Sequence, residues 1–471
     1  MSSSFFLKGK PKPNKKRKFP NDKKPSSTKQ IVEKSAKEDD NEEIPSDDEE
    51  DIEHSESAQN FQFSDEEDNE TPQDKRLKLA KKYLEEIEKE ERSRADDKDV
   101  RRGITKRLAN EYLDSVGKLR RTVADELAGF DDSCVTVLKH KLQKVPITCV
   151  CLSADGNFMF SGSKSQFVVK WNVQDLKPVG FFDCLKVPNT TGESSKKHRP
   201  QIWAMALSTD FKFLAVADMS KSIHIWCPKD LIHLHTLTGH RDTVTALVFR
   251  KDSHQLFSAS NDRSVKIWSV DEMAYIESLF GHQSPVTGID ASIRERAITS
   301  GGRDCTIRIW KITEESQLIY NGHKGSIENV KLINEEHFLS SGDDGSLCIW
   351  SGMKKKPLCV KELAHGKAEN GDANWISSIA TMFNTDVIAS ASVVGSCDGV
   401  IKLWKLGDHY RTITLLFDVP VKGFVNSLAF TSNGEKLIAA VGQEHRLGRW
   451  WRMKEAANRI LVISLNKKAV E

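Results

Sequence analysis

The chain has 471 residues, 38% of them hydrophobic and 29% charged, which allows a sizeable buried core and more than one domain. Its formal net charge of +2 hides an asymmetry, because residues 1–133 carry 28 Lys/Arg against 34 Asp/Glu and the remainder carries 42 against 34. No segment approaches the roughly 18 apolar residues of a membrane span, and the N-terminal MSSSFFLKGK contains no signal-peptide core. We therefore expect a soluble, intracellular protein whose basic C-terminal part favours an anionic partner.

Residues 1–72 are expected to form a disordered tail with blocks of charge. Between positions 38 and 70 there are 17 acidic residues and no Lys or Arg, a composition that does not offset the entropy cost of ordering the chain. A basic cluster precedes this run and predicts a nuclear localisation signal, with a merely solubilising tail as the alternative. Its central residues are Lys15, Lys16, Arg17 and Lys18. Ser46 and Ser64 stand directly before acidic residues and are candidate sites for an acidophilic kinase.

Hydrophobic periodicity predicts an amphipathic helical segment over 73–130. One apolar stripe follows 3-4-3 spacing and consists of Leu77, Ala80, Leu84 and Ile87. A second stripe extends at helical spacing from Ile104 to Val123, with Gly117 as a weak point. These helices either pack on the following domain or present an apolar face to a partner, and the sequence favours neither arrangement.

From about residue 134 onward, a pattern of His, Asp and Trp recurs. An Asp stands six residues before a Trp in four pairs: Asp262 and Trp268, Asp304 and Trp310, Asp344 and Trp350, Asp398 and Trp404. A Gly-His pair lies 27 or 28 residues before three of these tryptophans, at His240, His282 and His323. Tryptophans at 171, 226, 268, 310, 350, 404 and 450 mark seven units, between which short apolar–polar alternations predict β-strands.

These markers resemble the WD40 repeat family, whose blades are four-stranded antiparallel sheets around a channel. The resemblance implies an all-β fold, a seven-bladed propeller over 134–471. In this family the His, the Asp and the Trp of a blade are joined through a strand Ser or Thr, so that each buried polar group has a partner. We expect that structural network at His240, Asp262, Trp268, His282, Asp304, Trp310, His323, Asp344, Trp350, Asp398 and Trp404. A catalytic His–Asp pair is disfavoured, because an active site does not recur blade after blade.

Three blades depart from the pattern. Ser165, Ser220 and Glu444 stand where the turn Asp is expected in the first, second and last blades, so these blades should be less tightly fixed than the middle three. The segments 134–140 and 460–465 both have strand character and could complete the last blade. By the habit of the family we expect the N-terminal segment to close the ring.

The loop after each His marker and the turn that carries the Asp should emerge on one side of the disc. That side is rich in Lys and Arg, which can neutralise phosphates, although exposed loops carry charges in any case. The candidate RNA-binding residues are Lys164, Lys196, Lys197, Arg199, Lys221, Arg241, Arg263, Arg303, Lys324 and Arg446. Acidic neighbours such as Asp242, Asp343 and Asp344 favour a patch over a uniform ring. No array of exposed aromatic residues is evident, which favours recognition of RNA shape and backbone over single-strand reading.

The order of segments is itself informative: a basic tail, an acidic run, the helix ETPQDKRLKLAKKYLEEIEKEE (70–91), a second helix ending GKLRRTVADEL and seven repeats. It resembles the WD-repeat subunits of the U3 box C/D small nucleolar ribonucleoprotein. This resemblance implies a nucleolar protein that binds the box B/C element of U3 RNA together with a small kink-turn-binding protein. It further implies box C/D core proteins and the small-subunit processome as partners in pre-ribosomal RNA processing.

Enzyme motifs are missing, since the chain has no Walker A sequence, no G-x-S-x-G and no H-E-x-x-H. Nine cysteines without a C-x-x-C pair are best read as buried, reduced thiols. We therefore expect a non-catalytic protein without metal or cofactor. The alternative class is a nuclear WD40 adaptor of the chromatin or ubiquitin-ligase type that binds proteins without direct RNA contact. RNase-sensitive association would separate the two classes.

Overall fold

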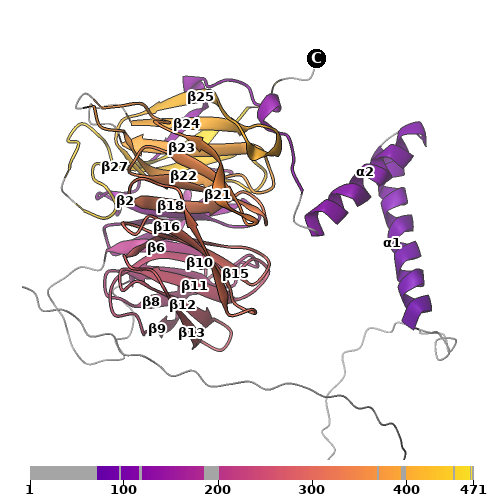
Figure 1. Cartoon of the computed structure of the whole chain (residues 1–471), viewed down its shortest axis with the longest axis horizontal. Helices are drawn as coiled ribbons and strands as arrows, with labels where there is room; N and C mark the ends of the chain where they lie inside the picture. Colours follow the sequence, from indigo (N-terminus) through magenta and orange to yellow (C-terminus); the bar gives the residue numbers. More distant parts are fainter. Residues whose placement is uncertain are drawn as a thin grey trace, which may run out of the picture. The chain divides into compact units, whose positions relative to one another are not determined.

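The computed structural model describes residues 72–94, 97–115, 119–184, 201–368, 371–393, 399–448, 451–466 and 468. Within these ranges seven four-stranded antiparallel sheets form a propeller, as the WD40 markers predicted (Figure 1). No described helix is long and apolar enough to cross a membrane. The basic cluster, Ser46 and Ser64 all lie outside the described residues.

Each blade takes four strands, numbered from the channel outward. Blade 1 consists of β2 (Ile147–Leu152), β3 (Phe158–Ser163), β4 (Phe167–Asn172) and β5 (Pro178–Asp183). Blade 2 consists of β6 (Ile202–Leu207), β7 (Leu214–Asp218), β8 (Ile223–Trp226) and β9 (His233–Leu237). Blade 3 consists of β10 (Val244–Phe249), β11 (Gln255–Ser260), β12 (Ser264–Ser269) and β13 (Ala274–Phe280). Blade 4 consists of β14 (Val286–Ala291), β15 (Arg296–Gly301), β16 (Thr306–Lys311) and β17 (Ser316–Asn321). Blade 5 consists of β18 (Ile327–Leu332), β19 (His337–Gly342), β20 (Leu347–Ser351) and β21 (Lys354–Lys361). Blade 6 consists of β22 (Trp375–Thr381), β23 (Val387–Val393), β24 (Gly399–Leu406) and β25 (Ile413–Val421). Blade 7 is β26 (Phe424–Phe430), β27 (Lys436–Gly442), β28 (Arg459–Ser464) and β1 (Val135–Leu138).

The ring closes by pairing the two ends of the propeller sequence. Strand β1 is the outer strand of blade 7 and pairs antiparallel with β28, with Val135 opposite Ile463. Both candidate segments therefore belong to the last blade, and the N-terminal one closes it, as expected. In Figure 1 the purple β2 of the first blade consequently lies beside the yellow β27 of the last.

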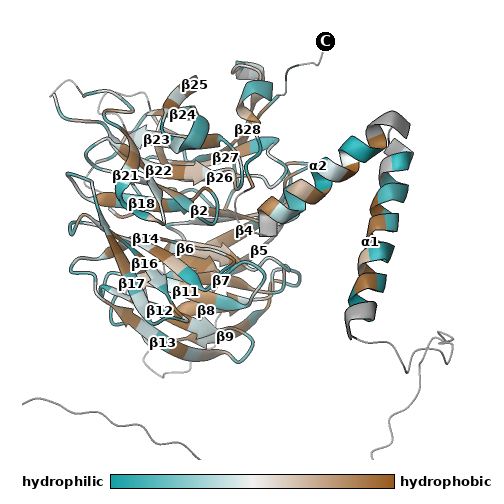
Figure 2. Ribbon diagram, turned by 45° about the vertical axis from the view of Figure 1, so that its right-hand side comes forward, coloured by the Kyte–Doolittle hydropathy of each residue, from teal (hydrophilic) through white to brown (hydrophobic). Residues whose placement is uncertain are grey.

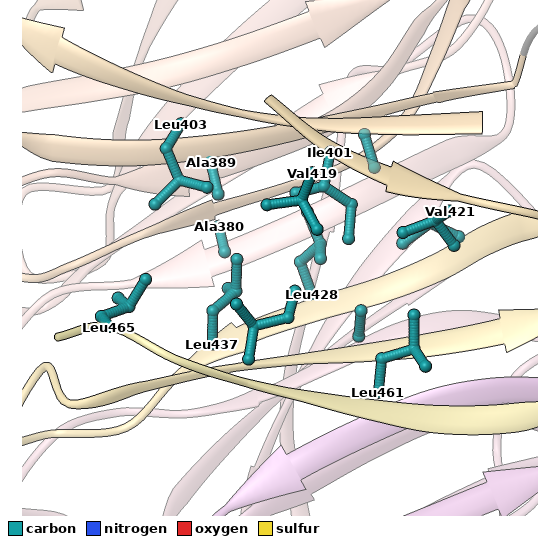
Figure 3. Close-up of a cluster of buried hydrophobic side chains, with 14 of the residues drawn as sticks. Ala380, Ala389, Ile401, Leu403, Val419, Val421, Leu428, Leu437, Leu461 and Leu465 are labelled. Atoms are coloured by element: carbon teal, nitrogen blue, oxygen red, sulfur yellow. The ribbon is translucent and has the colours of Figure 1, made fainter. Parts of the chain in front are cut away.

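The hydrophobic core lies between neighbouring blades, because each sheet buries residues on both faces against the next sheet. Figure 3 shows one such cluster, in which Ala389, Ile401 and Leu403 of blade 6 meet Leu437 and Leu461 of blade 7. The glycine of a Gly-His pair allows close packing against the Trp of its blade. A Cβ on Gly322 would lie 2.6 Å from the indole of Trp350, so only glycine permits this approach.

One tryptophan of the sequence pattern is not a blade marker. In blades 1 to 6 the Trp lies within the last three residues of the third strand, opposite the first or second residue of the second strand, for example Trp268 opposite Leu256. In blade 7 that place belongs to Ile463, opposite Leu437. Trp450 lies outside the described residues, in the stretch between β27 and β28, so counting it as the seventh marker was wrong.

Two helices precede the propeller, α1 (Pro72–Arg94) and α2 (Asp97–Ser115). They contact each other, since the Tyr83 hydroxyl donates to Glu111 at 2.6 Å and Arg107 pairs with Glu90 at 2.7 Å. Apolar and polar residues intersperse along both helices in Figure 2. Of the predicted α1 stripe, Ile87 is buried, whereas Leu77 remains 56% exposed.

The second apolar stripe does not stay helical to Val123, as the sequence suggested. Helix α2 ends at Ser115, and the chain from Leu119 onward lies against blade 6. The Asp386 carboxylate accepts hydrogen bonds from the backbone N–H groups of Val123 (2.7 Å) and Ala124 (3.1 Å). Arg120 donates to the carbonyl of Leu406 at 2.7 Å. Leu119 is therefore buried by packing on the propeller and not by a helical stripe. We call residues 119–127 the strap.

Candidate functional site

Blades 3, 4 and 5 each contain a complete hydrogen-bonded network. In blade 3 the His240 Nδ1 lies 2.9 Å from Asp262, the His240 Nε2 lies 2.7 Å from the Ser258 hydroxyl, and Trp268 Nε1 donates to the same hydroxyl at 2.8 Å. The same order recurs at His282, Thr299, Trp310 and Asp304, and at His323, Ser340, Trp350 and Asp344. Every polar atom on this line has a partner, which fixes the entry loop against the turn.

Burial and hydrogen bonding act against each other on these carboxylates. Burial disfavours the charged form of Asp304, but hydrogen bonds from His282 and Thr306 outweigh it and hold its pKa at about 2. Asp262 follows the same logic, and its pKa is lowered below the ordinary value despite burial. In blade 5 burial opposes protonation of His323, yet its interactions with Asp344 and Cys348 together outweigh burial and raise its pKa to about 9.

The other blades keep only part of the network. In blade 1 Gln143 replaces the His and accepts from Ser161 at 3.0 Å, while Trp171 donates to Ser161 at 2.8 Å. In blade 2 Val216 occupies the serine place, and the Trp226 Nε1 has no acceptor among the described residues.

Blade 6 joins His365, Ser390 and Trp404 at 2.8 Å each. Its predicted Asp398 lies outside the described residues, as does His198 of blade 2.

The networks place cationic side chains on the face of the propeller where the entry loops and turns emerge. Asp262 accepts from the backbone N–H of Arg241 at 2.9 Å, and Arg263 is the next residue of the same turn, with a φ of +68°. Lys221 donates to the carbonyl of Arg241 at 2.7 Å, which joins the turn of blade 2 to the loop of blade 3. Arg303 occupies the matching turn of blade 4 and is exposed. We call Lys221, Arg241, Arg263 and Arg303 the basic patch.

No carboxylate pairs with the side chains of the basic patch within the described part of the chain. Lys324 of blade 5 is exposed too, but it forms an ion pair with Glu362 at 2.9 Å. The arrangement is thus a patch over blades 2 to 4, beside acidic Asp343 and Asp344 of blade 5. Lys196, Lys197 and Arg199 lie outside the described residues.

Lys164 does not belong to an exposed surface, contrary to the sequence-based expectation. Its side chain is 3% exposed, lies 3.5 Å from the buried Glu444 and donates to the carbonyl of Gly448 at 3.2 Å. The ion pair joins the turn of blade 1 to the long connection of blade 7. Lys164 therefore stabilises the contact between the first and last blades and is not available to phosphate.

Arg446 is also misplaced by the sequence reasoning, because it reaches into the central channel. There it donates to the carbonyl of Thr287 at 3.2 Å. Inner strands of all seven blades line this cavity of about 340 Å³ together with Arg446. Burial lowers the pKa of Arg446, and nearby Glu328 counteracts that shift. The guanidinium is thus held in the channel and is absent from the basic face.

Seven four-stranded blades, with His–Ser/Thr–Trp networks in blades 3 to 6, define the WD40 β-propeller class. Residues 132–172, 191–227, 232–269, 274–311 and 314–351 match the family described as "WD domain, G-beta repeat". Human "U3 small nucleolar RNA-interacting protein 2" is 45% identical over 408 residues, which cover 85% of this chain and 84% of that protein. The chain belongs to the family of that protein. "Ribosomal RNA-processing protein 9" of Saccharomyces cerevisiae is 29% identical over 158 residues, 27% of each chain. The solved "Crystal structure of RRP9 WD40 repeats" is 45% identical, with a TM-score of 0.67, and covers 72% of this chain and 100% of that one.

Proposed function

We propose that this protein is a non-catalytic, RNA-binding subunit of the U3 small nucleolar ribonucleoprotein that acts in ribosomal RNA processing in the nucleolus. The finer proposal is that it binds the box B/C element of U3 RNA beside a kink-turn-binding protein and joins the small-subunit processome. The basic patch is the main observation that supports direct contact with RNA. The name of the human relative supports membership in the U3 particle, and the name of the yeast relative supports a role in ribosomal RNA processing.

The patch suits the backbone of a folded RNA. Its four cations come from three neighbouring blades. Buried networks fix the turns of blades 3 and 4, and Lys221 of blade 2 donates to the carbonyl of Arg241. Because these loops are already ordered, little conformational entropy is lost on binding, and the cations can face consecutive phosphates of a paired stem. The moderate number of charges also fits a composite site, in which a second protein on the same RNA contributes further contacts.

The proposal is tested with the full-length protein, a U3 box B/C stem and the kink-turn-binding protein, by fluorescence anisotropy at several salt concentrations. The variant Arg241→Glu with Arg263→Glu should weaken binding and lower the salt slope by about 2, because two phosphate contacts are lost. A matched control reverses the charge of Lys229 and Arg411, which are exposed on the opposite face of the disc. Equal losses for both pairs, or an unchanged slope for the first, would count against the patch.

The second candidate function is a WD40 adaptor for proteins. It is favoured by the apolar residues that the helices leave exposed, since Leu79 of α1 and Tyr112 of α2 are each 68% exposed. Under this proposal RNase treatment would leave the partners attached. Loss of association after RNase would favour the RNA-binding subunit.

A further inference from the structure

The connection between β27 and β28 forms a pocket on the same face as the basic patch. In blade 3 the corresponding turn needs only residues 261–263, whereas residues 443–458 make the connection in blade 7. Residues 451–456 of this connection border a cavity of about 310 Å³, near the lower end of the roughly 300–1,000 Å³ typical of small-ligand pockets. The cavity is lined by Lys422, Gly423, Trp451, Arg452, Met453, Lys454, Glu455 and Ala456.

Gln443 holds this connection in place. Its backbone carbonyl accepts from Met453 at 2.9 Å, and its side-chain amide donates to the carbonyl of Ala456 at 2.7 Å. Its amide oxygen accepts from Arg452 at 3.0 Å. Asn458 binds the Gln443 backbone N–H at 2.8 Å and donates to the carbonyl of Lys144, next to blade 1, also at 2.8 Å. The walls of the pocket are therefore preorganised in the absence of a ligand.

The pocket combines an aromatic wall with a cationic rim. Trp451 is half-buried and meets the fully buried Phe424 at 5.3 Å with an interplanar angle of 88°, which braces the indole from the blade side. Lys422, Arg452 and Lys454 are exposed at the rim, where Glu455 is the one carboxylate of the lining. Neither lysine has a carboxylate partner within the described ranges. Arg452 also lies 3.7 Å from Glu444, outside the lining, so the net positive charge of the rim rests on the two lysines against Glu455.

We infer that this pocket binds an unpaired nucleotide of RNA, with the base against Trp451 and the phosphate between Lys422 and Lys454. Aromatic rings offer every base a stacking surface, and adjacent cations neutralise its phosphate. The inference rests on the proposed function and extends it, because it assigns a single-stranded element to the blade 7 connection and leaves paired RNA to blades 2 to 4. It also refines the sequence reasoning, in which no array of exposed aromatic residues was evident: one placed tryptophan suffices for one base.

The test compares two RNA probes of equal charge, a single-stranded oligouridine and a fully paired duplex, on full-length protein. Trp451→Ala should weaken oligouridine binding about 10-fold, as expected for loss of one stacked base, and leave duplex binding and the salt slope unchanged. Trp451→Phe should retain most of the affinity. Lys422→Ala with Lys454→Ala should lower the salt slope for oligouridine by about 1–2. Phe181→Ala, an exposed aromatic residue on the outer strand of blade 1, serves as the matched control.

The outcomes separate this inference from the proposed function. If Trp451→Ala leaves oligouridine binding unchanged while Arg241→Glu with Arg263→Glu weakens duplex binding, the pocket inference is wrong and the proposed function stands. If the unaltered protein binds neither probe nor the U3 stem, both are wrong. If Trp451→Ala and Phe181→Ala weaken oligouridine binding equally, the effect is not that of a pocket and the inference is also overturned.

Discussion

The carboxylate of Asp262 accepts hydrogen bonds from the His240 ring and from the Arg241 backbone, both at 2.9 Å. One buried side chain thereby fixes the packing of blade 3 and the position of a cation on its surface. The relationship recurs in blade 5, where Asp344 binds His323 at 3.3 Å and the backbone N–H of Lys324 at 3.1 Å. The repeat network and the candidate RNA-binding face are therefore coupled through the same carboxylates.

Removing the Asp262 carboxylate should lower stability and RNA affinity together. Asp262→Ala leaves the His240 Nδ1 without its acceptor and releases the Arg241 loop, so we expect the free energy of unfolding to fall by on the order of 2–3 kcal/mol. Urea denaturation measures the first effect and anisotropy the second. Asp242→Ala, which removes an exposed carboxylate from the same loop, should change stability far less. Equal costs for the two substitutions would mean that the network is not the source of the stability.

Lys164 should matter for stability and not for RNA. Lys164→Ala removes a cation 3.5 Å from buried Glu444, whose distance to Arg452 is longer at 3.7 Å, and breaking such a buried pair costs about 3 kcal/mol. Adding Glu444→Gln should restore much of the loss, because the buried negative charge that Lys164 neutralised is then removed. A double-mutant cycle in urea measures the coupling, and the salt slope for the U3 stem should stay unchanged. A lower salt slope for binding of the U3 stem would instead indicate that Lys164 is exposed and contacts phosphate.

Glu328 should make the propeller less stable as the pH rises. Burial raises the pKa of Glu328 to about 7, with Arg446 opposing the shift, so the folded state binds a proton that the unfolded state has released. Stability should therefore fall between about pH 4.5 and 7 and level off above that range.

The variant Glu328→Gln isolates this effect. In the other blades Thr245 and Thr287 donate from the inner strand to a carbonyl of the next blade at 2.5 and 2.7 Å, and an amide at position 328 could do so without titrating. We expect it to raise stability by on the order of 1–3 kcal/mol at pH 8 and to change little at pH 4. Thermal unfolding at the two pH values provides the measurement, and an equal effect at both would contradict the role of the proton.

The strap should detach when Asp386 is changed. Asp386→Ala removes the acceptor of two strap N–H groups in a buried position, which should cost about 1–3 kcal/mol. Limited trypsin digestion should then cut faster after Arg120 and Arg121. Asp125→Ala removes only the exposed ion pair between the strap and Lys405, and its digestion rate should remain close to that of the unaltered protein. Resistance of Asp386→Ala to trypsin would show that other contacts hold the strap.

The propeller could be predicted because its markers are local and repeated. The spacing of His240, Asp262 and Trp268 follows from one supersecondary unit, and the same unit recurs along the chain. Gln143 was missed because an amide can replace an imidazole as acceptor without preserving the motif. Lys164 was misplaced because its partner, Glu444, comes from the opposite end of the propeller sequence. Helix α2 was predicted too long because packing of the strap on blade 6 overrides helical periodicity.

The pairing of β1 with β28 has a consequence for how the protein is made. Strand β1 is the first strand of the propeller to leave the ribosome, and its partner β28 is the last. The backbone edge of β1 therefore stays unpaired while six blades are synthesised. A nascent chain that stops before Arg459 lacks both the third strand of blade 7 and any partner for β1. Completion of the ring thus depends on complete translation, and truncated products would expose an open edge that chaperones and proteases can recognise.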